Sequence, residues 1–329
     1  MYLFKYILKR LLLLVLTFAI IMTICYVLIK LLPSRPIEQF GKDMEVILRR
    51  RVLLHQMYVD EAGNYHETPI LEQYFYFLYY AFRGDFGVSE FISPGRDVWS
   101  VFLEKVPYTV AVNLYSIVLS IPLGIALGIL AAVKKNTWID HVISTGVMVF
   151  VSVPSFVFGF VVQYLLCFKW KLFAPLMDAT GGPFSWTGFS TMFPAALCLA
   201  FGSIAAFARY TRAELTEVLT GEYMLLARTK GLTRAQATVR HALRNSMVPI
   251  FPMILGEFIG IMSGSLILEG MFGIPGVGAL YITSVQASPP DYNFFVLLSG
   301  FYILIGLVAG IVVDISYGFI DPRIRMGAK

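Results

Sequence analysis

The chain has 329 residues, of which 57% are hydrophobic and only 14% are charged. A soluble domain of this size must cover its surface with polar groups, so this composition excludes an ordinary soluble protein and indicates a surface that faces lipid. The formal net charge of +5 would suit a nucleic-acid partner. We expect no such partner, because most of the basic residues cluster on one side of the predicted membrane spans.

Six apolar runs are long enough to cross a bilayer as helices, since a membrane core takes about 20 mostly apolar residues in one helix. The runs are residues 11–29, 110–133, 141–168, 192–207, 249–268 and 294–320. Pro122, Pro154 and Pro252 lie in or near these runs and should kink them, which helices packed in a bundle tolerate. The sequence therefore predicts an all-α polytopic membrane protein with six transmembrane helices.

The positions of Lys and Arg predict how these spans are oriented. Basic residues gather at both termini, after the second run, and in a dense cluster between the fourth and fifth runs. The positive-inside rule then places both termini in the cytoplasm and the chain in the cytoplasmic membrane. The first run follows Lys5, Lys9 and Arg10, but no small-residue cleavage site follows it, so we interpret it as a retained anchor.

This orientation divides the chain into four parts. Residues 1–30 hold the cytoplasmic N-terminus and the first span, and residues 31–106 form an extracytoplasmic segment. Residues 107–320 hold the five remaining spans, and residues 321–329 form a cytoplasmic tail.

The extracytoplasmic segment carries several local signals. Residues 43–57, with arginines at 49–51, predict a basic amphipathic helix, and the Gly-Asn pair at 63–64 predicts a turn. The Thr-Pro pair at 68–69 predicts a helix cap followed by the first helical residue. Residues 74–82 then carry seven aromatic side chains in nine positions. This favours an interfacial helix at the lipid headgroups, with a docking surface for an external binding protein as the alternative.

The predicted cytoplasmic connection at residues 211–248 is far longer than the 2–8 residues or so that usually join neighbouring helices. Thr220 can cap a short helix that holds Glu222 in its first turn. Arg228 and Lys230 fall in the last turn, an order of charges that suits the helix dipole. Gly231 then suits the left-handed residue that often ends a helix.

A second short helix is predicted just after this glycine. Residues Thr233 to Gln236 form a capping-box pattern, and the helix would run to about Asn245 before Pro249 opens the next span. Two short helices joined at a glycine would make a rigid protrusion that can receive force from a partner protein. An amphipathic hairpin lying on anionic lipid is the alternative.

Small and acidic residues within the spans suggest where helices meet or where a solute passes. Gly256, Gly260 and Gly264 recur every four residues in the fifth run, as do the glycines at 124 and 128 in the second. Such stripes favour close helix packing, and lining of a translocation path is the functional alternative. Glu257 lies between these glycines, and an acid within a span faces the bundle interior or a watery cavity. It could contact a peptide's amino group, accept a hydrogen bond from a backbone donor, or pair with a neighbouring subunit.

The run from Glu222 to Leu232, followed by the residues at 240–245 and Pro249, resembles the coupling loop of binding-protein-dependent ABC importer permeases. The resemblance is to the oligopeptide, dipeptide and nickel branch in particular. Gly231 matches the glycine of the permease motif and Ala227 its second alanine. Residues 225, 226 and 244 depart from the general motif, and the departures at 225 and 244 resemble those of the peptide branch. By this resemblance, the residues that couple to an ATPase are Glu222, Tyr223, Leu226, Ala227, Arg228, Lys230, Gly231, Arg240, His241 and Arg244.

Four other segments are similar to signatures of the same branch, in the same order along the chain. They are residues 83–89, 151–156, 268–278 and 321–325. Together they identify the chain as resembling the first of the two permease subunits of peptide importers. The resemblance implies the type I ABC importer permease fold and the import of oligopeptides or dipeptides by alternating access, with nickel or another small solute as the alternative.

The same resemblance implies a set of partner proteins. These are a homologous second permease, two cytoplasmic P-loop ATPases that use ATP and Mg²⁺, and an extracytoplasmic peptide-binding protein. The chain itself contains no Gly-x4-Gly-Lys-[Ser/Thr] sequence, so hydrolysis is expected in the ATPases and not here. We expect this chain to bind no cofactor or metal, because its three cysteines and four histidines show no ligand spacing.

Two other classes of membrane protein remain as alternatives. An ion-coupled secondary transporter would need inverted repeats with ionisable groups in both halves, whereas the acids here cluster in the C-terminal half. A purely structural scaffold would have no need of a folded connection at residues 211–248.

Overall fold

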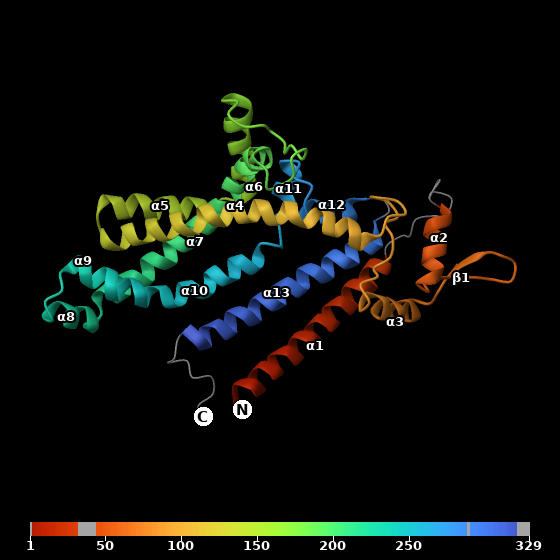
Figure 1. Ribbon diagram of the computed structural model, residues 1–329, viewed down its shortest axis with the longest axis horizontal. Coiled ribbons are helices and arrows are strands. Elements are labelled where there is room, and N and C mark those ends of the chain that lie inside the picture. The colour runs from red at the N-terminus through yellow and green to blue at the C-terminus, as the bar shows by residue number, and fades with distance from the viewer. Residues whose placement is uncertain (1, 32–43, 288–289, 321–329) are drawn as a thin grey trace. The chain divides into compact units, whose positions relative to one another are not determined.

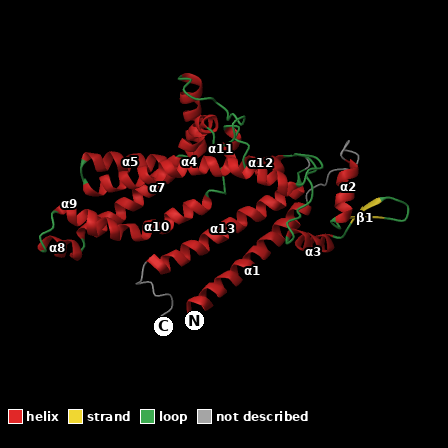
Figure 2. Ribbon diagram, in the orientation of Figure 1, coloured by secondary structure: helices red, strands yellow, loops and turns green. Residues whose placement is uncertain are grey.

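The computed structural model describes residues 2–31, 44–287 and 290–320 (Figures 1 and 2). The predicted cytoplasmic tail at 321–329, with its signature at 321–325, lies outside the described residues. The chain separates into two compact units. The first contains residues 1–109 and 275–308, and the second contains residues 110–274 and 309–329.

The described chain is mostly helical, which confirms the predicted all-α class apart from one short hairpin (Figure 2). The first unit begins with α1 (Tyr2–Lys30), α2 (Met44–Leu53), strands β1 (Met57–Val59) and β2 (Tyr65–Glu67), and α3 (Ile70–Ala81). The elements that follow are α4 (Val98–Val133), α5 (Trp138–Ser152), α6 (Ser155–Val162), α7 (Trp186–Thr220), α8 (Glu222–Thr229), α9 (Arg234–Ala237), α10 (Leu243–Gly260), α11 (Leu266–Met271), α12 (Val277–Gln286) and α13 (Tyr292–Ile320). Two π-helical segments, Gln163–Lys169 and Thr238–Ala242, continue α6 and α9.

Within the described residues, four helices are long and apolar enough to cross a membrane by length and composition. They are Leu8–Lys30, Val98–Val133, Trp186–Thr220 and Tyr292–Ser316. The pair formed by Trp138–Ser152 and Ser155–Lys169 adds a fifth if it is one broken span. The count of six spans stays a prediction.

Two predicted spans are longer in the structure than in the sequence analysis. Helix α4 starts at Val98, so the predicted extracytoplasmic segment at 31–106 runs into the first turns of this helix. Helix α7 extends from Trp186 to Thr220, so residues 211–220 are helical and do not belong to a loop. Leu215 and Val218 are buried on the same face as earlier apolar residues of α7. This buried stripe continues the helix beyond the apolar run that marked the span.

The third predicted span, residues 141–168, is not one straight helix. Helices α5 and α6 meet at an angle of 102° across Val153 and Pro154. Proline has no backbone N–H to donate to the preceding turn, and the residue before it is driven into extended conformation. Val153 has φ −100° and ψ 127°, as this rule requires. The expected kink at Pro154 is therefore confirmed and amounts to a complete break.

The fifth predicted span, residues 249–268, is also interrupted. Helix α10 ends at Gly260, and α11 begins after Ser265, whose hydroxyl accepts a hydrogen bond from the backbone N–H of Leu268. Gly264 has a φ of +62°, a conformation that L-residues rarely adopt. Gly264 therefore marks a turn, and it does not continue a helical stripe with Gly256 and Gly260.

In the first unit, α1 packs against α3 through aromatic side chains. Tyr26 of α1 is buried and its ring stacks on Phe77 of α3, with ring centroids 5.0 Å apart. The hydroxyls of Thr23 and Tyr74 lie 2.5 Å apart and share a hydrogen bond. Phe75 of α3 and Phe82, the C-cap residue that follows it, are exposed. The predicted aromatic helix is confirmed, although Pro69 occupies its N-cap position and Thr68 does not cap it.

The first unit also holds two buried carboxylates with well-defined partners. The Asp291 Oδ2 atom accepts hydrogen bonds from the Ser89 hydroxyl and from the backbone N–H groups of residues 90, 91 and 92. Glu90 forms a bidentate pair with Arg51, at 2.6 Å for each N–O distance. Arg51, expected on the surface of a basic amphipathic helix, is therefore buried instead, because its charge is paired.

The predicted turn at Gly63 and Asn64 joins β1 to β2 in an antiparallel hairpin. Asp60 organises this turn, since its carboxylate contacts the His66 ring nitrogen and accepts from the backbone N–H groups of Ala62 and Asn64. These contacts, that of His66 above all, lower the pKa of Asp60 to about 2.

In the second unit, α4 and α7 approach each other closely at two glycines. A Cβ atom added at Gly124 would lie 2.6 Å from the Cβ of Phe207, and one added at Gly128 would lie 2.5 Å from the Cβ of Thr211 and 2.7 Å from the carbonyl oxygen of Ala208. No side chain fits at these distances. The glycine stripe predicted in the second span therefore serves close helix packing.

We expect Gly128→Ala to lower the free energy of unfolding by about 1–3 kcal/mol, because the added methyl group forces α4 and α7 apart. Thermal unfolding of the purified protein in detergent measures the effect. Gly146→Ala in α5 is the matched control, since a Cβ there meets nothing within 4 Å. Equal loss of stability in both variants would contradict the packing role of Gly128.

Candidate functional site

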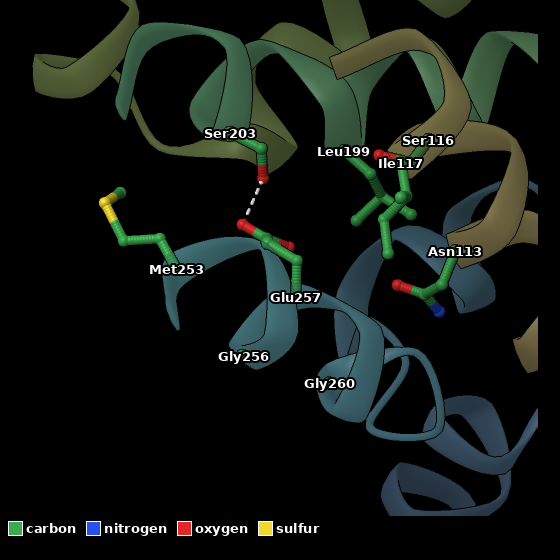
Figure 3. Close-up of a pocket in the computed structure, with 9 residues that line it drawn as sticks. All are labelled: Asn113, Ser116, Ile117, Leu199, Ser203, Met253, Gly256, Glu257 and Gly260. Atoms are coloured by element: carbon green, nitrogen blue, oxygen red, sulfur yellow. Dashed lines mark hydrogen bonds between the residues drawn. The ribbon is translucent and has the colours of Figure 1, made fainter. Parts of the chain in front are cut away.

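A cavity of about 410 Å³ lies between α4, α7 and α10 of the second unit (Figure 3). Its lining residues are Asn113, Ser116, Ile117, Leu199, Ser203, Met253, Gly256, Glu257 and Gly260. The volume falls within the range of about 300–1,000 Å³ that is usual for small-molecule sites. The close packing of α4 on α7 at Gly124 holds two of the three walls together.

Helix α10 carries the one acidic side chain in this lining. The Ser203 hydroxyl of α7 donates a hydrogen bond of 2.9 Å to the Oε1 atom of Glu257 (Figure 3). Glu257 is half-buried, as is Ser203. A carboxylate has four lone-pair sites, so this single bond orients Glu257 and leaves further accepting capacity on its carboxylate.

The structure separates the three glycines that were predicted to form one stripe. Gly256 and Gly260 line the cavity beside Glu257, while Gly264 lies in the turn after α10. A Cβ added at Gly260 would meet nothing within 4 Å, and one at Gly256 would meet only Val313, at 3.6 Å. Neither glycine is therefore needed for close packing within the second unit. Their lack of a side chain leaves the cavity open.

The sequence analysis missed the residues that α4 and α7 contribute to the cavity. Asn113 and Ser116 are three residues apart on α4, and Ser203 lies on α7. A signal for them was present, because polar side chains on one face of an otherwise apolar span usually face a bundle interior or a cavity.

The second candidate site is the helical hairpin that follows α7, residues 221–242, here called the surface hairpin. The predicted first helix is confirmed as α8, with Glu222 in its first turn and Arg228 in its last. Thr220 does not cap it. The Thr220 hydroxyl donates back to the carbonyls of Thr216 and Glu217, which keeps Thr220 in α7, and Gly221 occupies the N-cap position.

The turn between the two helices of the surface hairpin follows the prediction closely. Gly231 has a φ of +89°, and the backbone N–H of Leu232 donates to the carbonyl of Ala227. The Thr233 hydroxyl then accepts from the Gln236 N–H, and the Gln236 side chain accepts from the Thr233 N–H. This reciprocal pair confirms the capping box.

The second helix of the surface hairpin does not end at Asn245 as predicted. It passes from α9 through the π-helical residues 238–242 directly into α10. Pro249 and Pro252 lie inside α10 and do not open a new helix. One helical path therefore runs from the surface hairpin to Glu257.

A small apolar core fixes the surface hairpin to α7. Met224, Ala227, Ala237 and Ala242 are buried in one cluster with residues of α7 and with Ala132 of α4. Of the ten residues predicted to couple to an ATPase, Ala227 therefore serves this core, and the side chain of Tyr223 is not described. The others are exposed, namely Glu222, Leu226, Arg228, Lys230, Gly231, Arg240, His241 and Arg244.

An ion pair joins α5 to α7 close to the surface hairpin. The Arg212 guanidinium donates to both carboxylate oxygens of Asp140, at 2.6 Å and 2.8 Å. Asp140 also accepts from the Ser144 hydroxyl and the Asn136 backbone N–H. The Asp140 side chain is only 2% exposed, whereas Arg212 is 34% exposed. Such a bidentate pair, with its carboxylate buried, holds the two helices at a fixed register.

We expect Arg212→Met to lower the free energy of unfolding by about 3 kcal/mol, because it leaves the Asp140 charge buried without its cation. Adding Asp140→Asn to Arg212→Met should restore part of that loss, since the double variant has no unpaired charge. SDS-induced unfolding in mixed micelles measures all three proteins. A double variant that is no more stable than Arg212→Met alone would contradict this account.

No group of three or more His, Cys, Asp or Glu side chains that could hold a metal ion occurs in the described part of the chain.

The chain is similar in sequence to known proteins over nearly its whole length. The family described as binding-protein-dependent transport system inner membrane component matches residues 124–326. The dipeptide transport system permease protein DppB of Lactococcus lactis subsp. cremoris is 32% identical over 322 residues, which cover 98% of this chain and 99% of that protein. The oligopeptide transport system permease protein OppB of Haemophilus influenzae is 30% identical, with 98% of this chain and 99% of that protein covered.

Two solved structures also align with this chain. The inward-facing MetNI methionine ABC transporter aligns with 66% of this chain and 96% of its own, at 17% identity and a TM-score of 0.48. An amino acid ABC transporter crystallised with histidines aligns with 67% of this chain and 94% of its own, at the same identity and TM-score.

Proposed function

The chain belongs to the family of binding-protein-dependent transport system inner membrane components, and on that basis we propose that it is a permease subunit that imports dipeptides or oligopeptides. The peptide class is supported by the relatives, which are named as dipeptide and oligopeptide permeases and align with this chain from end to end. As an inner-membrane component of this family, the chain resides in the cytoplasmic membrane. We further propose that both termini lie in the cytoplasm, which the distribution of basic residues supports.

The observation that carries the proposal is the continuous helical path from the surface hairpin to the cavity. A movement of α8 and α9 passes through residues 238–242 into α10, which carries Gly256, Glu257 and Gly260. Because the buried core of the hairpin also includes residues of α7 and Ala132 of α4, a push on the hairpin reaches the ends of these helices as well as α10. Alternating access then follows if a partner pushes the hairpin and the helices around the cavity shift relative to one another.

The exposed face of α8 fits a protein partner on the cytoplasmic side. Leu225 and Leu226 are 67% and 56% exposed at its centre, and Glu222 and Arg228 flank them. An apolar patch rimmed by charges is typical of a protein interface. We assign this face to one of two P-loop ATPases, which bind ATP and Mg²⁺ and hydrolyse the nucleotide, while the chain itself catalyses no reaction. A second, homologous permease and an external peptide-binding protein complete the proposed importer.

Affinity purification tests the composition of this importer. We expect the tagged chain, extracted gently from native membranes, to bring with it a second permease and one or two P-loop ATPases that mass spectrometry identifies. A preparation that contains this chain alone and still takes up solute would overturn the proposal in favour of a self-sufficient transporter.

Replacing Gly231 tests the coupling role of the surface hairpin. Gly231→Val forces a β-branched residue into left-handed conformation, which costs at least about 1–2 kcal/mol and distorts the turn between α8 and α9. We expect peptide uptake by the reconstituted importer to fall by tenfold or more, while ATP hydrolysis continues and membrane insertion is normal.

Two variants serve as controls for Gly231→Val. Gly182→Val introduces the same backbone strain at a φ of +77°, also with open space around the new Cβ, but outside the surface hairpin. Gly231→Asn keeps a residue that tolerates the left-handed region. Both should transport normally. Normal uptake by Gly231→Val itself would refute the coupling role.

A further inference from the structure

We propose that the cavity between α4, α7 and α10 binds the protonated α-amino group of the peptide in transit, with the Glu257 carboxylate as its acceptor (Figure 3). This inference rests on the proposed function and names the part of the cargo that the cavity recognises. The cavity therefore binds the ammonium end of a peptide and not its carboxylate end.

The charge of the lining determines which end of a peptide the cavity takes. Among the lining residues, all of which the structure describes, Glu257 alone carries an ionisable side chain. The other polar lining groups are the amide of Asn113 and the hydroxyls of Ser116 and Ser203. None of these can neutralise a carboxylate, whereas Glu257 can neutralise an ammonium group.

The hydrogen bond from Ser203 prepares Glu257 for this role. Ser203 holds the Oε1 atom at 2.9 Å and so selects one orientation of the carboxylate toward the cavity. An ammonium group has three donors and no acceptor. It can bind the lone pairs that Ser203 leaves free without breaking the existing bond. The bond therefore positions the carboxylate and does not consume it.

The glycines on α10 make room for the bound group. Gly256 precedes Glu257 directly and Gly260 lies nearly one helical turn further on, so these two positions beside the carboxylate add no side chain to the cavity. A cavity of about 410 Å³ can then hold the first residue of a peptide together with its amino group.

The remaining lining suits the first side chain of such a peptide. Ile117, Leu199 and Met253 line the same cavity from the three different helices. Methionine adapts its shape to varied apolar groups. The cavity thus combines one charged anchor with a permissive apolar wall, which is the arrangement expected for a carrier of peptides with different sequences.

Glu257 lies in the predicted fifth membrane span, and this location adds to the strength of the contact. An ionic interaction gains strength where water is scarce, and an unpaired carboxylate there is costly. A passing ammonium group removes that cost for as long as it stays. Helix α10 is continuous with the surface hairpin, so a displacement of the hairpin would also move Glu257 relative to Ser203. Such a movement would change how the cavity holds the ammonium group and so release or retain the cargo.

The test compares two cargo molecules on the complete importer, reconstituted with its binding protein in proteoliposomes. One is a tripeptide with a free α-amino group, and the other carries a hydroxyl group in place of that amine. The two cargo molecules are chosen so that the purified binding protein binds both with equal affinity. Any difference in uptake then arises in the membrane-bound importer and not in the binding protein. Uptake is measured for the wild type and for Glu257→Gln, Glu257→Asp and Glu61→Gln.

We expect the wild type to transport the amine cargo at least about tenfold faster than the hydroxyl cargo under subsaturating conditions, because a charge-assisted contact is lost with the amine. Glu257→Gln should abolish that preference by slowing the amine cargo alone. Glu257→Asp, which keeps the charge, should retain part of it. Glu61→Gln removes an exposed carboxylate from the β1–β2 turn and should leave the preference unchanged.

The outcomes separate this inference from the proposed function. If the wild type takes up neither cargo, the proposed peptide import itself fails. If the wild type takes up peptide but has no preference for the amine, or if Glu257→Gln slows both cargo molecules equally, the amine site is refuted and Glu257 has only a structural role.

Discussion

The second unit depends on the close approach of α4 and α7 at Gly124 and Gly128. At this spacing no side chain fits between the helices, so backbone lies against side-chain Cβ atoms and carbonyl oxygens. In a lipid environment the hydrophobic effect does not drive helices together, and such tight van der Waals contact must supply the association instead. The contact also positions the polar residues of both helices around one cavity. The candidate site therefore depends on Gly124 and Gly128, which have no side chains to hold the helices apart.

Polar groups within the two units obey the same rule, namely that a buried charge needs a partner. Asp140 forms an ion pair with Arg212, and Glu90 forms one with Arg51. Asp291 accepts hydrogen bonds from a hydroxyl and three backbone N–H groups. Glu257 differs from these acids, since among the described residues its carboxylate accepts a single hydrogen bond, from the neutral Ser203 hydroxyl. This difference distinguishes a carboxylate that holds helices together from one that is available to a solute. It also explains why the proposed ligand is a cation.

The surface hairpin illustrates how local signals succeed and where they fail. Gly231 and the pair Thr233 and Gln236 were predictable because each acts over three or four residues, through backbone conformation or a cap that needs no distant partner. Thr220 was misplaced because a threonine hydroxyl can cap the following helix or bond back to its own, and the sequence does not decide between them. The buried stripe at Leu215 and Val218 keeps α7 helical, so that the hydroxyl bonds back.

The sequence by itself determined the membrane class, the mainly helical fold, the turn at Gly231 and, through five resembling segments, the family that the comparison bears out. It also singled out Glu257 as an acid within a predicted span. Only the tertiary structure decided that Gly256 and Gly260 open a cavity while Gly264 forms a turn, and that Asn113, Ser116 and Ser203 line the same cavity as Glu257. The reason is physical. Hydrophobic composition, hydrophobic periodicity and helix caps act within one element. A cavity exists only where several helices meet, and its lining depends on packing distances between residues far apart in the chain.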